Sequence, residues 1–156
     1  MRVGFFFWPG AFESGHVALQ SGLLEGLLAQ EEHSIIVISP EPQCEVDVNP
    51  PHQFVSYRRA HGLLNTLTAY DLAIEVPAAA LIRRLDIDAL IAWANWPMPR
   101  VTVPVLAVLH ETDFLEPCPW NFFTGRMLHL MSLTLGRNLK RATAVFTNSE
   151  YTASRA

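Results

Sequence analysis

A histidine and several acids follow directly after one apolar run of this chain. The stretch VLAVLHETDFLEP, residues 105–117, places His110, Glu111 and Asp113 behind five apolar residues. A neutral imidazole can donate to, or accept from, a sugar hydroxyl or a phosphate, and carboxylates can take up or release protons during a reaction. A binding or catalytic role is therefore one interpretation. The alternative is a loop histidine bonded to local backbone groups, accompanied by solvated or helix-capping acids.

A glycine-containing loop follows the first apolar run of the sequence. WPGAFESGH, residues 8–16, contains Gly10, Ser14 and Gly15 and leads into a helical pattern. Backbone N–H groups at a helix N-terminus can meet a phosphate or sugar oxygen, and Ser14 can cap the helix. The loop matches neither GxGxxG nor the phosphate-loop pattern GxxxxGKS/T. A ligand-binding loop and a plain strand-to-helix turn both stay open.

Two tryptophans border the predicted site loops. Trp93 and Trp96 both lie in WANWPMP, where their rings can stack on a sugar or complete the edge of the core. The six histidines show no HExxH or comparable pairing, so we expect no metal site. The two cysteines, Cys44 and Cys118, form no CxxC pair, which favours a reducing compartment.

Alternating strands and helices position these loops. Apolar runs predict strands at residues 2–7, 34–39, 88–93, 103–109 and 144–148, with a further candidate at 71–76. Helical periodicity predicts helices at 16–30, 78–85 and 121–142 and a weak helix at 60–69. The proline-rich segment at 40–60 is expected to be irregular. This order predicts a single α/β domain, residues 1–156, with a Rossmann-like, doubly wound, mostly parallel sheet and helices on both faces. In such sheets ligands bind beyond the carboxyl ends of the strands, where all three loops should gather.

The helix expected at 16–30 carries two stripes. Four leucines between positions 23 and 28 form an apolar face, while Ala18, Gly22 and Gly26 form a stripe of small residues. Interior glycines cost about 1 kcal/mol each relative to alanine. We therefore expect the small-residue stripe to pack closely against the sheet, which would offset that cost.

Composition narrows the class of protein. Half of the 156 residues are hydrophobic, 17% are charged, and the net charge of −4 gives no general attraction to nucleic acid. No apolar stretch reaches the roughly 18 residues of a spanning helix, and the N-terminal apolar run is too short for a signal peptide. We expect a cytoplasmic protein. Arg137, Lys140 and Arg141 either compensate a helix dipole or make a peripheral contact at the inner face of the membrane.

Three segments, taken in order, resemble the N-terminal domain of GT-B fold glycosyltransferases of family four, the retaining glycogen synthase-like and mannosyltransferase-like group. They are RVGFFFWPGAFESGHVALQSGLLEGLLAQEEHSIIVIS, VPVLAVLHETDFLEP and RNLKRATAVFTNSEYTASRA. The resemblance implies that His110 faces the donor sugar and the reaction centre. The family's aspartate usually follows this histidine directly, so either Glu111 or Asp113 takes its place here.

Two further pairs of residues match family positions. Ser14 and Gly15 match the family's Gly-Gly loop, close to the donor phosphate and the acceptor, although a serine replaces the first glycine. Ser149 and Glu150 match the Ser-Glu pair that opens a helix after a strand. The family's nucleotide site, and the basic pair that stabilises the departing diphosphate, lie in a second Rossmann-like domain.

The resemblance thus implies the acceptor-side domain of a retaining hexosyltransferase. It would move a hexose from a nucleotide-diphosphate sugar, its co-substrate, to a sugar, glycan or lipid-linked acceptor, with no cofactor and no nucleic-acid partner. The donor domain would follow in the chain or come from a second chain, so residues 1–156 should be inactive alone and should self-associate or pair through an uncovered sheet edge. Two alternatives stay open: a non-catalytic α/β interaction module, and a dinucleotide-binding oxidoreductase domain with Glu41 as its ribose-binding acid.

Overall fold

The computed structural model describes residues 1–7, 14–39, 46–57, 78–96, 98–110 and 125–154. Several expectations from the sequence lie outside these ranges. They are the weak helix at 60–69, the candidate strand at 71–76, the environment of Glu41 and the two cysteines.

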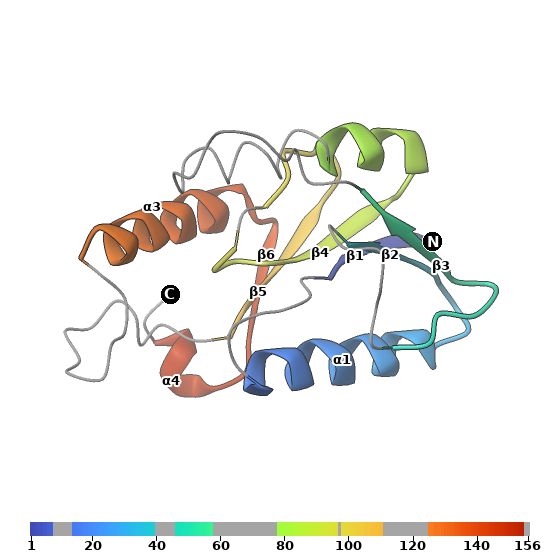
Figure 1. Ribbon diagram of the computed structural model, residues 1–156, viewed down its shortest axis with the longest axis horizontal. Helices are drawn as coiled ribbons and strands as arrows, with labels where there is room; N and C mark the ends of the chain where they lie inside the picture. Colours follow the sequence, from blue (N-terminus) through green and yellow to red (C-terminus); the bar gives the residue numbers. More distant parts are fainter. Residues whose placement is uncertain (8–13, 40–45, 58–77, 97, 111–124, 155–156) are drawn as a thin grey trace.

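The described strands form one parallel sheet (Figure 1). Its strands are β1 (Arg2–Phe6), β2 (Ser34–Ser39), β3 (Gln53–Ser56), β4 (Ala89–Trp93), β5 (Val105–Leu109) and β6 (Ala144–Thr147). Their spatial order is β3-β2-β1-β4-β5-β6, and every neighbouring pair is parallel. The strand order therefore reverses between β1 and β4, which is the topological switch point of a doubly wound sheet.

Helices cover both faces of the sheet, because the chain winds outward from the centre in two directions. In Figure 1, α1 (Ser14–Leu28) and α4 (Glu150–Ala153) lie on one side of the sheet, and α3 (Gly125–Arg141) and the helix at 78–85 lie on the other. The predicted Rossmann-like α/β fold is confirmed. Within the described ranges, no helix combines the length and apolar character needed to cross a bilayer.

Two apolar layers, one on each face of the sheet, hold these elements together. Phe5 and Phe7 pack with Leu24 of α1, whereas Phe6, between them in sequence, packs with Ile82 of the helix at 78–85. All five side chains are at most 3% exposed. Burying a side chain of this size contributes about 1.5–3 kcal/mol. The first strand is apolar at consecutive positions because both of its faces are covered.

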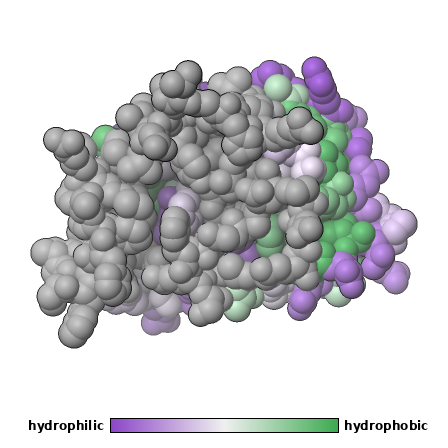
Figure 2. All heavy atoms as spheres, in the orientation of Figure 1, coloured by the Kyte–Doolittle hydropathy of each residue, from purple (hydrophilic) through white to green (hydrophobic). Residues whose placement is uncertain are grey.

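The expectation of an irregular segment at 40–60 is wrong for residues 53–56, which form β3. This strand lies at the edge of the sheet and pairs in parallel with β2. Its residues are only partly buried or exposed, so the strand lacks the apolar run that reveals a central strand. On the same side of the molecule, Figure 2 shows apolar residues reaching the surface beside hydrophilic ones. A side chain also links the two strands, since the Ile35 N–H donates to Nδ1 of His52 at 3.1 Å.

The expectation that the small-residue stripe of α1 packs against the sheet is also wrong. Ala18, Gly22 and Gly26 are exposed, and a Cβ added at either glycine would have no atom within 4 Å. The leucines instead face the sheet, with Leu24 fully buried. Burial of the leucine face sets the rotation of the helix, because it removes far more apolar area from water than the small residues would.

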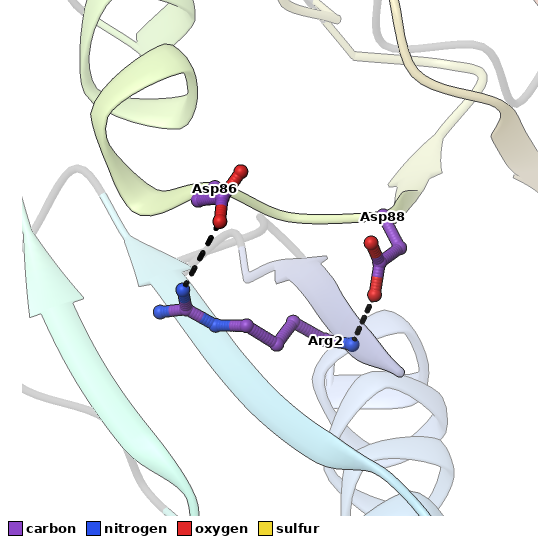
Figure 3. A network of polar contacts seen from close by, with 3 residues as sticks. All are labelled: Arg2, Asp86 and Asp88. Atoms are coloured by element: carbon purple, nitrogen blue, oxygen red, sulfur yellow. Dashed lines mark hydrogen bonds and ion pairs between the residues drawn. The ribbon is translucent and has the colours of Figure 1, made fainter.

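A polar network closes the amino edge of the sheet (Figure 3). The Arg2 N–H donates to Oδ2 of Asp88 at 2.7 Å, and the Asp88 N–H donates to the Arg2 carbonyl at 2.8 Å. The Arg2 guanidinium also lies 4.0 Å from Asp86, but the two side chains are 42% and 97% exposed, so solvent screens this ion pair. Asp86 follows the helix at 78–85 with a φ of 50°, the left-handed conformation of many helix C-termini. These contacts join β1 to the start of β4.

We expect Gly22→Ala and Gly26→Ala each to stabilise the protein by roughly 0.5–1 kcal/mol, because alanine restricts the unfolded chain and its Cβ meets open space here. Chemical denaturation of the single and double variants measures this. The matched control is Gly4→Ala in β1, whose added Cβ would lie 2.7 Å from Cδ1 of Ile87. That overpacking should cost about 1–3 kcal/mol. A loss of stability in both α1 variants would contradict the exposed position of the stripe.

Candidate functional site

Two polar side chains meet where β5 and β6 end. The register pairs Leu109 with Thr147, so His110 and Asn148 leave neighbouring parallel strands at the same edge. Nδ2 of Asn148 lies 2.8 Å from Nδ1 of His110, which is hydrogen-bonding distance. His110 is half-buried and Asn148 is exposed. The imidazole is therefore held by a neighbour while part of its surface is accessible at the edge where doubly wound sheets bind ligands.

The cap of α4 holds the backbone of the same histidine. The Ser149 hydroxyl accepts from the Thr152 N–H at 3.1 Å and donates to Oγ1 of Thr152 at 3.0 Å. Thr152, only 3% exposed, donates through a long contact of 3.5 Å to the His110 carbonyl. A serine cap of this kind contributes about 1 kcal/mol to a helix end. The sequence expectation that Ser149 and Glu150 open a helix is confirmed, since α4 begins at Glu150.

The carboxyl end of β4 contributes the two tryptophans. Trp93 is 2% exposed and packs in the same apolar layer as Phe5 and Val108. Trp96 is half-buried and packs against the layers on both faces. Trp93 is therefore a core residue, which was the alternative to stacking on a sugar. Trp96 retains an exposed part next to the carboxyl edge.

A buried asparagine of α3 fixes the turn between these tryptophans. Asn138 is 0% exposed, and its Nδ2 donates to the carbonyls of Ala94 at 2.9 Å and Trp96 at 2.7 Å. Asn138 is not among the site residues predicted from the sequence. Its spacing in the sequence could have revealed it, because Asn138 lies three positions after the buried Leu135 and thus on the apolar face of the helix. A polar residue on a buried face needs a partner, and here the partners are backbone carbonyls of the site loop.

The remaining predicted site residues are only partly described. Ser14 and Gly15 form the first two positions of α1, whose start lies near the carboxyl edge in Figure 1. Gly10, Glu111 and Asp113 lie outside the described ranges. The structure thus brings His110 together with Asn148 and, through its backbone, Thr152. In the described part of the chain, no group of three or more His, Cys, Asp or Glu residues is arranged to hold a metal ion.

An apolar hollow of about 310 Å³ lies at the opposite edge of the sheet. The amino ends of β1, β4 and β5 and the end of α1 line it, with Val3, Leu27, Ile91 and Leu106 among its residues. Its lining is almost wholly apolar, whereas a site for a sugar or phosphate needs several convergent polar groups. The polar site at His110 is therefore the better candidate for the recognition of such ligands.

No family model matches the chain, and no curated protein is found to be similar to it.

We expect Asn138→Leu to destabilise the protein by about 2–4 kcal/mol, because it leaves one buried and one partly buried carbonyl without their donor. Chemical denaturation followed by the fluorescence of the four tryptophans measures the stability. Leu133→Ala serves as the control on the same helix, since Leu133 is 57% exposed and should change stability by less than about 0.5 kcal/mol. Equal stability of the two variants would refute the anchoring role of Asn138.

Proposed function

We propose that this chain is the acceptor-side domain of a retaining glycosyltransferase of the GT-B type. It would act in the transfer of a hexose from a nucleotide-diphosphate sugar to a sugar, glycan or lipid-linked acceptor. The observation that carries the proposal is the position of His110 at the carboxyl end of β5, hydrogen-bonded to Asn148 at the end of β6. The resemblance of the segments around β1, β5 and β6 to family four supports the same function.

The chemistry of transfer suits an imidazole at this place. A histidine that bonds a hydroxyl of the donor sugar can hold the reacting carbon over the acceptor, and positioning of this kind lowers the barrier to reaction. Neither a metal nor a cofactor is required of the protein for such a step. Trp96, half-buried beside the same edge, offers an aromatic surface on which a sugar ring can stack.

The distribution of basic side chains supports an acceptor-side role. Arg126 lies in the first turn of α3. The other basic residues that the structure describes lie in segments that lead into the amino ends of strands: Arg2, Arg83, Arg84, Arg100, Arg137, Lys140 and Arg141. These seven residues therefore stand away from the carboxyl edge that holds His110. A departing diphosphate needs positive groups near its developing charge. We propose that a second domain, in the same chain or in a partner chain, supplies them together with the nucleotide site.

The oxidoreductase alternative shares the fold but differs at the first loop. The strand order β3-β2-β1-β4-β5-β6 is also that of dinucleotide-binding domains, so topology alone does not separate the two functions. The loop WPGAFESG after β1 lacks the GxGxxG pattern through which such domains approach a pyrophosphate. This difference favours the glycosyltransferase.

We expect residues 1–156 alone to show negligible affinity for nucleotide sugars, because the proposed nucleotide site lies in another domain. Titration calorimetry with UDP-glucose and GDP-mannose tests this, with NADH as the third ligand. Micromolar binding of a nucleotide sugar would contradict the division of roles between two domains. Micromolar binding of NADH would instead support the oxidoreductase.

We expect His110→Ala, in the enzyme that joins this chain to its donor-binding domain, to lower turnover by roughly a hundredfold, the scale of one positioned catalytic group. Stability should barely change, because His110 contributes little to the core. His52→Ala is the matched control. Its imidazole accepts the Ile35 N–H and links β2 to β3, so its loss should lower stability and leave turnover nearly intact. Retained turnover in His110→Ala would remove this histidine from the reaction and with it the main support for the function.

A further inference from the structure

We propose that the apolar hollow at the amino edge of the sheet binds the aliphatic chain of a single anionic amphiphile, such as a fatty carboxylate, with the charged head beside the end of α3. The hollow lies at the opposite edge of the sheet from His110, and its use does not depend on the function proposed above. Its size, its lining and the unequal charge of its two borders lead to this assignment.

The hollow has the size of a small-molecule site. Its volume is about 310 Å³, which falls at the lower end of the range for ligand pockets. An apolar cavity of about 150 Å³ holds one benzene molecule, so a space of about twice that volume has room for roughly eight to twelve carbon atoms. A hydrocarbon chain of medium length therefore fits.

The lining selects a hydrocarbon over a polar ligand. Ile91 and Leu106 come from the adjacent strands β4 and β5, and Leu27 comes from α1. None of the lining residues that the structure describes is Asp, Glu, Lys or Arg. The polar residues Gln30 and Thr143 are exposed. Water inside such a space finds few hydrogen-bond partners, so its replacement by an aliphatic chain is favourable.

The border of the hollow beside β5 and β6 is basic. The segments 98–106 and 137–144, which supply Leu106 and Thr143 to the lining, contain four basic residues and no acid: Arg100, Arg137, Lys140 and Arg141. Lys140 is exposed in the last turn of α3, three residues before Thr143. Three residues span at most roughly 11 Å, so Lys140 stands near this border.

The border beside α1 has the opposite charge. Glu31 and Glu32 are exposed and directly precede His33, which lines the hollow. A carboxylate head is repelled by these two acids and attracted to the side of Lys140, so the charges set the direction in which an anionic amphiphile binds. The four basic residues of the other border outnumber the two acids, which favours an anionic head over a cationic one.

Titration calorimetry of the full chain at about pH 8, where carboxylates are ionised, tests the binding. We expect affinity to rise about fourfold for each CH₂ added between hexanoate and decanoate, because each group buries a similar apolar area. Decyltrimethylammonium, with the same chain and a cationic head, should bind more weakly than decanoate. The proposal is overturned if decanoate shows no saturable binding below the concentration at which it forms micelles, or if the two amphiphiles bind equally well.

Two phenylalanine substitutions on β6 test the position of the chain. Ala144 lines the hollow, so Ala144→Phe should fill part of it and lower decanoate affinity about tenfold or more, the effect of losing two buried CH₂ groups. Val145→Phe is the matched control, because successive residues of a strand face opposite sides of the sheet. Its decanoate affinity should equal that of the wild type. Unchanged affinity in Ala144→Phe would refute the site.

Amide NMR shifts of the wild-type chain give the same answer without a substitution. Decanoate should shift the signals of Ala89 and Leu106, which line the hollow, and leave that of Asn148 at the other edge in place. Shifts confined to the carboxyl edge would place the amphiphile elsewhere and overturn the proposal.

Reversal of one charge tests the position of the head. Lys140→Glu should lower decanoate affinity by about two- to tenfold at low ionic strength and leave the affinity for uncharged decanol unchanged. Arg126→Glu makes the same change in the first turn of α3, about 21 Å away along the helix, and should alter neither affinity. An unchanged decanoate affinity in Lys140→Glu would show that the head does not bind at the basic border.

An anionic membrane offers the same chemistry from a second source. Sedimentation with phosphatidylglycerol vesicles separates the two, because the proposed site takes one chain from solution. Vesicle binding without binding of monomeric decanoate would indicate a membrane-contact surface in place of a site for a single amphiphile, and would overturn the proposal.

Discussion

The parallel pairing of β1 with both β2 and β4 is the constraint on which the rest of the structure depends. Val3 lies opposite Ile35 on one side and Ala89 on the other, so β1 stands at the centre of the sheet and the chain winds away from it in both directions. Because every described strand runs the same way, all their carboxyl ends share one edge. A central strand of this kind must be apolar on both faces, which is why Phe5, Phe6 and Phe7 can follow one another.

The two edges of the sheet serve different purposes as a result. At the amino edge, backbone and side-chain contacts between Arg2 and Asp88 fasten β1 to β4, and an apolar hollow opens beside α1. At the carboxyl edge, side chains bond to each other and to loop carbonyls, as between His110 and Asn148. Strand ends at this second edge are free of the demands of core packing, so polar residues can be placed there without loss of buried apolar area.

Helices on opposite faces reach this edge and fix its loops. From one face, Asn138 of α3 donates to two carbonyls of the turn after β4. From the other, Thr152 of α4 contacts the carbonyl of His110. Each anchor is buried, so its hydrogen bonds are shielded from competition with water, and losing one partner would leave a costly unpaired group. Such surrounding contacts hold the loop after β4 and the backbone of the half-buried His110 in a defined geometry.

The sequence by itself determined the central strands, the layered fold and the place of His110. Short apolar runs bounded by turn residues favour strands that are covered on both faces, and a residue directly after such a strand stands at the carboxyl edge of a parallel sheet. Only the tertiary structure decided that 53–56 forms an edge strand, that the small residues of α1 face solvent, and that His110 meets Asn148. The physical reason is the range of the contacts. Asn148 is 38 positions from His110, and Asn138 is 44 from Ala94, so these bonds follow from strand register and helix packing, which no local pattern encodes.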